Sequence, residues 1–86
     1  MLYITHIHLE GGERLEHITS VHWTNGAKTD TSTREAMVRW IDEGGEAWVK
    51  APTGDVRVLV VRATPPYLRS EANNRLTDNL LALPRF

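Results

Sequence analysis

One segment of this chain has the pattern of an amphipathic helix, and its isolation limits the folds that the chain can adopt. Residues 32–35, Ser-Thr-Arg-Glu, have the form of a capping box, in which the Ser32 hydroxyl and the Glu35 side chain bond free N–H groups at the start of a helix. Apolar residues follow at helical spacing, at Ala36, Met37, Trp40 and Ile41. We expect this face to pack on a sheet with Trp40 in the core, and the helix to end at Gly44-Gly45.

The remaining sequence predicts β-strands separated by turns. Alternating or β-branched runs predict strands at Leu2–Leu9, Glu16–Thr24, Glu46–Lys50, Val56–Ala63 and Tyr67–Arg69. Three consecutive apolar residues, 59–61, indicate that the fourth of these strands is central and covered on both faces. The last segment, 78–84, has the pattern either of a capped turn that Pro84 stops or of an apolar edge strand, and we favour the turn.

The chain is expected to form a single small domain over residues 1–86. Its class is α+β, a mainly antiparallel sheet of about five strands with one amphipathic helix packed on one face. The 86 residues, 41% of them apolar, are too few for two cores. The three tryptophans are the first core candidates: Trp23, Trp40 and Trp48. The absence of cysteine excludes disulfides, thiolate nucleophiles and zinc knuckles.

Two further absences suggest where the protein works. No stretch approaches the roughly 18 apolar residues of a membrane span. The first twelve residues lack the basic region and the long apolar region of a signal peptide. We therefore expect a cytoplasmic protein.

The charge of the chain argues against a general affinity for polyanions, because the formal net charge is −1. Arginines nevertheless gather in the second half, and the candidate binding residues there are Arg57, Arg62, Arg69 and Arg75. The aromatic residues Tyr67, Trp48 and Trp23 could stack nucleobases beside them. We favour the simpler interpretation, in which the arginines are solvated or paired with carboxylates and the aromatic residues pack in the core. Nucleic acid is therefore not the expected partner.

The histidines are the one group that suggests metal chemistry. His6 and His8 are two residues apart on a strand and so share a face. If the first hairpin pairs residues whose numbers sum to 25, His8 lies opposite His17, and Glu10 lies near them. Three imidazoles and a carboxylate could bind zinc or another divalent ion. A shift of one residue in the register would separate His17 from the others, which would leave solvent-facing or hydrogen-bonded structural histidines.

No arrangement of residues predicts catalysis. The serines lack the Gly-x-Ser-x-Gly elbow of a hydrolase, and neither glycine pair belongs to a phosphate-binding loop. Asp42 and Glu43 are adjacent on the predicted helix, so their side chains diverge and cannot act as an acid–base pair. We assign no catalytic residue and no cofactor, and the sequence favours a protein that is not an enzyme.

Five motifs that span nearly the whole chain carry a resemblance to a known family. They are I-T-H-I-x-x-x-G-G at 4–12, E-H-I-T-x-V-x-W at 16–23, S-T-R-x-x-M-V-x-W-I at 32–41, Y-L-R at 67–69 and T-D-N-L-L-A-L-P at 77–84. Together they resemble a bacterial family of short proteins catalogued as domain of unknown function 3892. The chain departs from the family after Arg69, where Ser70 and Glu71 replace the usual continuation. The resemblance implies a small, stand-alone cytoplasmic protein of a bacterium or phage, and it implies no activity.

These features favour a non-catalytic binding or protein-interaction module. The alternatives are a divalent-metal protein that uses the histidines and a weak nucleic-acid-binding protein that uses the C-terminal arginines. We also expect a homodimer, because an open sheet leaves two unpaired edges and the apolar tail, 80–83 with Phe86, needs cover. The alternative is a monomer whose tail folds back over its own sheet.

Overall fold

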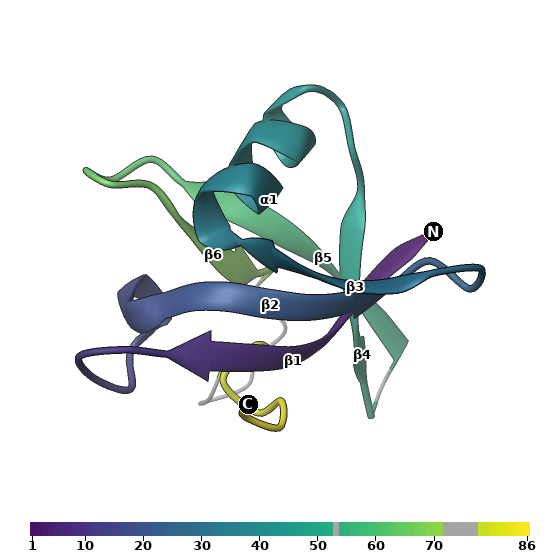
Figure 1. Cartoon of the computed structure of the whole chain (residues 1–86), viewed down its shortest axis with the longest axis horizontal. Coiled ribbons are helices and arrows are strands. Elements are labelled where there is room, and N and C mark those ends of the chain that lie inside the picture. Colours follow the sequence, from purple (N-terminus) through teal and green to yellow (C-terminus); the bar gives the residue numbers. More distant parts are fainter. Residues whose placement is uncertain (53, 72–77) are drawn as a thin grey trace.

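The protein folds into one sheet with a single α-helix beside it (Figure 1). A computed structural model describes residues 1–52, 54–71 and 78–86. The strands are β1 (Leu2–Leu9), β2 (Ile18–Thr24), β3 (Thr29–Thr33), β4 (Ala47–Ala51), β5 (Gly54–Val61) and β6 (Tyr67–Ser70). The helices are a short 3-10 turn, η1 (Leu15–His17), and α1 (Arg34–Asp42). The predicted α+β class is confirmed.

The sheet has six strands in the order β3-β2-β1-β4-β5-β6. All neighbours run antiparallel except β1 and β4, which are parallel because the chain passes through β2, β3 and α1 before it returns to the other side of β1. The sheet curls, so that α1 contacts β2 and β3 on one side and β5 and β6 on the other. The predicted mainly antiparallel sheet is therefore confirmed.

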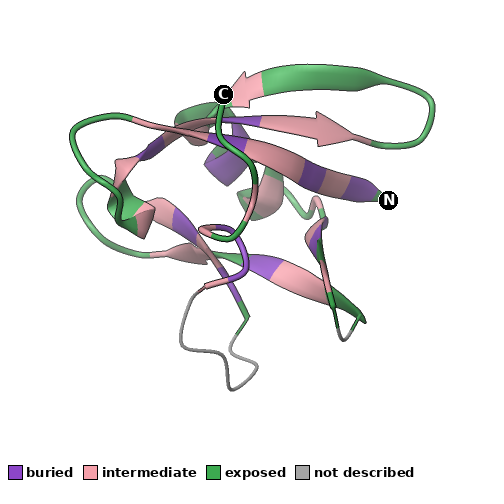
Figure 2. Cartoon of the chain, turned by 90° about the horizontal axis from the view of Figure 1, so that it is seen from below, coloured by how far each residue is buried: buried purple, intermediate pink, exposed green. Residues whose placement is uncertain are grey.

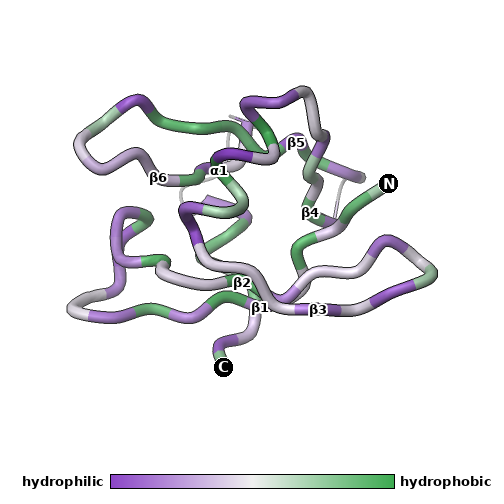
Figure 3. Tube along the Cα trace, turned by 45° about the horizontal axis from the view of Figure 1, so that its top comes forward, coloured by the Kyte–Doolittle hydropathy of each residue, from purple (hydrophilic) through white to green (hydrophobic). Residues whose placement is uncertain are grey.

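The core lies between the inner face of this curled sheet and α1. Its buried apolar residues come from every strand except β3, from α1 and from the C-terminal segment (purple in Figure 2): Leu2, Ile4, Ile7, Ile18, Val21, Met37, Val38, Ala47, Val49, Val58, Leu68 and Leu80. Figure 3 shows the contrast with β3, whose residues are hydrophilic or neutral. In β1 a register shift between Ile4 and His6 lets Ile4 and Ile7 both point into the core.

The C-terminal segment completes the sheet beside β1. Because β1 and β4 pair at only Leu2 and Tyr3, the rest of β1 has an open side. There the Ile7 N–H donates to the Pro84 carbonyl at 3.0 Å, and the Phe86 N–H donates to the Ile7 carbonyl at 3.1 Å. In Figure 2, which looks at the molecule from below, the segment passes in front of the strands. It carries Leu80, which is 0% exposed, into the core. This tail therefore covers its own sheet.

The predicted turn in this segment is confirmed. The Leu80 N–H donates to the Asp78 carboxylate at 2.9 Å, and the Ala82 N–H donates to the Asp78 carbonyl at 3.2 Å. The Ser70 N–H and hydroxyl also donate to Asp78, at 3.1 and 2.9 Å. The same carboxylate therefore caps the turn and ties it to β6.

The helix begins one residue later than predicted. Thr33 is its N-cap, and the Thr33 hydroxyl accepts the Ala36 N–H at 3.1 Å. Strand β3 extends through Thr33, so helical backbone starts only at Arg34, and the Ser32 hydroxyl accepts the Trp23 indole N–H instead. The strand β3 was not predicted, since five polar residues with no apolar alternation give no strand signal.

The assignment of large apolar residues to the core was wrong at three positions. Trp40 is 38% exposed, because α1 meets the sheet through Met37 and Val38, which are buried. Leu59 is also 38% exposed, since β5 is covered on one face rather than on both. Trp48 is half-buried and lies under Arg57 rather than in the core cluster.

Candidate functional site

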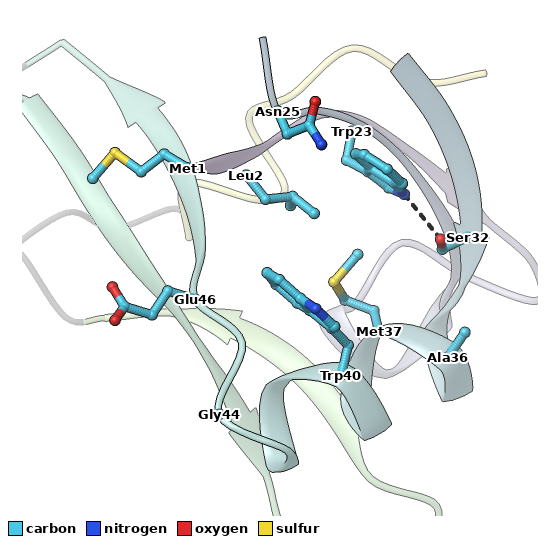
Figure 4. A pocket seen from close by; sticks show the side chains of 10 residues that line it. All are labelled: Met1, Leu2, Trp23, Asn25, Ser32, Ala36, Met37, Trp40, Gly44 and Glu46. Carbon is cyan, nitrogen blue, oxygen red and sulfur yellow. Dashed lines mark hydrogen bonds between the residues drawn. The ribbon is translucent and has the colours of Figure 1, made fainter. Parts of the chain in front are cut away.

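A cleft on the inner side lies between α1 and the adjoining ends of β1, β2 and β3 (Figure 4). Its volume is about 680 Å³. The side chains of Trp23 and Trp40 form two of its walls, and Leu2 and Met37 lie between them. The remaining lining residues are Met1, Asn25, Ser32, Ala36, Gly44 and Glu46. The cleft is thus mainly apolar, as small-molecule sites generally are.

The first wall, Trp23, is held by a hydrogen bond across two strands. Trp23 lies on β2, and its indole N–H donates to the Ser32 hydroxyl on β3 at 2.9 Å (Figure 4). The antiparallel pairing of Val21 with Ser32 and of Trp23 with Asp30 brings the two side chains within reach. The hydroxyl that we expected at the helix N-cap therefore orients an aromatic wall of the cleft.

The second wall, Trp40, is held by the glycines that end α1. Gly44 has a φ of +102°, a conformation that favours glycine, and it turns the chain back toward the helix. The Gly45 N–H then donates to the Trp40 carbonyl at 2.9 Å. A Cβ at Gly45 would lie less than 3.0 Å from the Trp40 ring. The indole is consequently fixed in place although more than a third of it is exposed.

The polar groups of the cleft are few. The amide of Asn25 lies near the indole of Trp23, and the carboxylate of Glu46 lies at the open end and turns away from Trp40 (Figure 4). Glu46 carries the one charged side chain among the lining residues, and its carboxylate disfavours an anionic ligand. The chemistry of the cleft favours a flat, mostly apolar ligand. Sequence reasoning missed this site because it assigned both indoles to the core, and the glycine pair after Trp40 was the available signal.

The histidines form a cluster, but with a different membership from the one predicted. His6 pairs with His22 on β2, and their rings meet edge to face at 5.5 Å between centroids. The Phe86 ring stacks on His22 at 3.6 Å and 19°, and His8 Nδ1 bonds the Phe86 carbonyl oxygen. The expected register is wrong, because His8 lies opposite Ser20.

His17 lies apart from this cluster, in η1. Its Nδ1 accepts the Arg14 N–H at 3.1 Å, and its ring lies over Gly12, where a Cβ would come within 3.0 Å of it. Two of the other rings also have hydrogen-bond partners, His6 with Thr5 and His22 with Thr31. In the part of the chain that the structure describes, no group of three His, Cys, Asp or Glu residues is placed to hold a metal ion.

Of the four candidate arginines, Arg57 and Arg69 lie on the same face of neighbouring strands, and Arg62 lies apart from them. Arg57 lies over the Trp48 ring at 5.6 Å, and Arg69 lies opposite Leu59 on the neighbouring strand. Arg62 instead bonds the Asp42 carboxylate through both of its terminal nitrogens, and this hydrogen bonding lowers the pKa of Asp42. Arg75 lies outside the described residues.

A comparison with known protein families gives one match. Residues 3–84 match the model of a family described as proteins of unknown function, DUF3892. The chain belongs to the DUF3892 family. No curated protein and no solved structure matches it. Among the described residues, no helix of this DUF3892 protein is long and apolar enough to cross a bilayer.

Proposed function

We propose that this DUF3892 protein is a non-catalytic binding module whose site is the cleft between Trp23 and Trp40. The observation that carries the proposal is that both indoles are held in position at an open cleft, Trp23 by Ser32 and Trp40 by Gly45. Side chains that are already ordered lose little conformational entropy when a ligand arrives, and this preorganisation increases affinity. The ligand that fits is a flat, largely apolar molecule without a negative charge.

An exposed indole also costs the protein stability that burial would supply. Fully burying a large apolar side chain contributes about 1.5–3 kcal/mol. A chain of 86 residues buries little surface, so a large side chain left 38% exposed is a notable loss. A ligand that covers Trp40 would recover part of this free energy.

Nuclear magnetic resonance on the ¹⁵N-labelled protein tests the proposal, because each of the three tryptophans has its own indole N–H signal. The probes are three naphthalenes of similar size: 2-naphthylmethanol, 2-naphthylmethylamine and 2-naphthoate. We expect the alcohol and the amine to shift the signals of Trp23 and Trp40, while the backbone amide signals of η1, which lies outside the cleft, serve as the internal control. The anionic probe, 2-naphthoate, should bind more weakly than the alcohol or the amine.

Two variants distinguish binding in the cleft from nonspecific binding elsewhere on the surface. Ala36→Trp fills the cleft from an exposed position of α1, so it should abolish the shifts without removing a core side chain. Trp48→Phe is the matched control and should leave them unchanged. Shifts of the η1 amides equal to those of the Trp23 and Trp40 indoles, or no shifts with any probe, would overturn the proposal.

A further inference from the structure

The outer face of β4, β5 and β6 brings together cations and aromatic rings that lie far apart in the sequence. Side chains on one face of a sheet alternate along each strand and match between paired residues. Tyr3 pairs with Trp48, and Trp48 pairs with Arg57. Two residues further along β5 the same face carries Leu59, whose partner on β6 is Arg69. Lys50 and Tyr67 follow by the same alternation. We call this set the cation–aromatic face: Tyr3, Trp48, Lys50, Arg57, Tyr67 and Arg69.

Contacts within the face place cations on rings. Lys50 Nζ lies 5.0 Å from the centre of the Tyr3 ring, and the Arg57 guanidinium lies 5.6 Å from the centre of the Trp48 ring. Both distances are within the range of a cation–π interaction. The Tyr3 hydroxyl donates to Asp55 at 2.6 Å, which fixes that ring. Positive charge and flat apolar surface thus alternate across four strands, β1, β4, β5 and β6.

The three cations of this face are available to a partner. Lys28, Arg34 and Arg62 each pair with a carboxylate within 4.0 Å, but none of Lys50, Arg57 and Arg69 pairs with a carboxylate of the described residues. The register places two acidic residues among them, Asp55 opposite Lys50 and Glu71 opposite Arg57, so the face carries three cations and two carboxylates. This is an excess of one positive charge, although the chain as a whole is at −1.

A hollow next to this face offers room for a ligand. A hollow of about 640 Å³ opens beside the Tyr3 ring and Lys50, and Thr5, Thr24 and Leu83 also line it. The Trp48 indole N–H is buried and has no hydrogen-bond partner among the described residues.

We propose that the cation–aromatic face binds single-stranded nucleic acid. Unpaired bases can stack on the rings of Trp48, Tyr67 and Tyr3, and the neighbouring cations can neutralise phosphates, which is how proteins bind single strands without reading their sequence. A duplex offers its phosphates but keeps its base faces stacked, so it can use only the cations. An acidic protein would likewise leave the rings without their preferred contact.

Fluorescence anisotropy with a labelled oligothymidine of about 15 nucleotides tests this proposal, with a duplex of the same length as the comparison. We expect the single strand to bind more tightly than the duplex, and its affinity to fall steeply as the salt concentration rises. Arg57→Gln and Arg69→Gln should each weaken binding by roughly threefold to tenfold, because each removes one phosphate contact. Trp48→Leu should weaken it by about tenfold through lost stacking.

Arg62→Gln is the matched control, because it removes the same charge from a site that already pairs with Asp42 and lies off this face. Its affinity should equal that of the parent protein. Equal losses for Arg57→Gln and Arg62→Gln would show a general effect of charge and overturn the proposal. Tighter binding to the duplex, or no binding at low salt, would also overturn it. If Trp48→Leu fails to fold, the double variant Arg57→Gln, Arg69→Gln decides.

Discussion

The Trp40 indole lies directly on the backbone of Gly45, in the space that any other residue would fill with its Cβ. Trp40 ends the last full turn of α1, and Gly45 is where the chain doubles back along it. This contact explains how a side chain that is 38% exposed keeps a defined position at the edge of the cleft. It also makes Gly45 the most specific point at which to disturb the cleft.

Gly45→Ala should therefore destabilise the protein and move Trp40. The added methyl group overlaps the ring, and overpacking of this kind typically costs about 1–3 kcal/mol. Urea unfolding measures the loss, and the Trp40 indole N–H signal reports the displacement. In a protein that already carries Trp40→Ala, Gly45→Ala should lower the free energy of unfolding only slightly, because the indole ring that the new methyl group would overlap is absent. An equal cost in both backgrounds would show that the effect does not come from this contact.

Ser32→Ala and Thr33→Ala should have different effects although the residues are neighbours. Thr33→Ala removes the N-cap, so it should lower the free energy of unfolding by about 1 kcal/mol and speed hydrogen exchange at the Ala36 amide. Ser32→Ala instead removes the acceptor of the Trp23 indole N–H. It should weaken naphthalene binding and shift that indole signal while the Ala36 amide stays protected. If Ser32→Ala instead speeds hydrogen exchange at the Ala36 amide, the N-cap is Ser32 and the assignment of Thr33 is wrong.

Leu80→Ala should destabilise the protein strongly, because Leu80 is 0% exposed in the core and a Leu→Ala change there costs about 2–5 kcal/mol. Leu81, its half-buried neighbour, provides the control, and Leu81→Ala should cost clearly less. Chemical denaturation of both variants gives the comparison. Equal costs would mean that the C-terminal segment does not seat Leu80 beneath the sheet.

The ion pair of Arg62 with Asp42 predicts a small loss of stability in acid. Hydrogen bonding from Arg62 holds the pKa of Asp42 below its value of 3.8 in a model compound. The unfolded chain therefore binds the proton first, and stability from this pair is present above the unfolded pKa and is lost as the pH falls through the folded pKa. Titration of the Asp42 carboxyl signal should show the lowered pKa, and Arg62→Gln should raise it toward the ordinary value. An unchanged pKa in that variant would contradict the pairing.

Self-association stays a prediction, and the tail no longer supports it because Leu80 is covered within one chain. The remaining reason is the outer edge of β3, the end strand of the sheet. By the alternation of antiparallel pairing the Thr31 N–H points outward, and Asp30 Oδ1 accepts it at 2.8 Å. Asp30→Ala frees this donor and should strengthen the dimer in sedimentation equilibrium. A single species near 9.8 kDa at every concentration, for both proteins, would exclude a dimer.

Local sequence patterns predicted the elements with strong local signals. The alternation in residues 2–9 predicted β1 with its observed ends, and the capped turn after Asp78 follows from residue types within five positions of each other. The helix was predicted, but its first residue was misplaced by one. Ser32 and Thr33 are both good N-cap residues, and only the extent of β3 through Thr33 decides between them. β3 gave no signal, since it is held by β2 rather than by burial of its own side chains.

The candidate sites depended on relationships that no local pattern contains. Whether His8 lies opposite His17 or Ser20 depends on the register of a hairpin with an irregular ladder, and each shift of one residue reverses the faces. Met37 is buried and Trp40 is exposed, and this difference in burial depends on how α1 is rotated against the sheet. Trp48 meets Tyr3 because β1 pairs with β4, although the two residues are 45 positions apart in the chain, and Trp48 meets Arg57 because β4 pairs with β5. The amino-acid sequence by itself determined which segments bury apolar surface, since that property is local. Only the tertiary structure decided which side chains share a face, because strand order and register bring together residues that are distant in the chain.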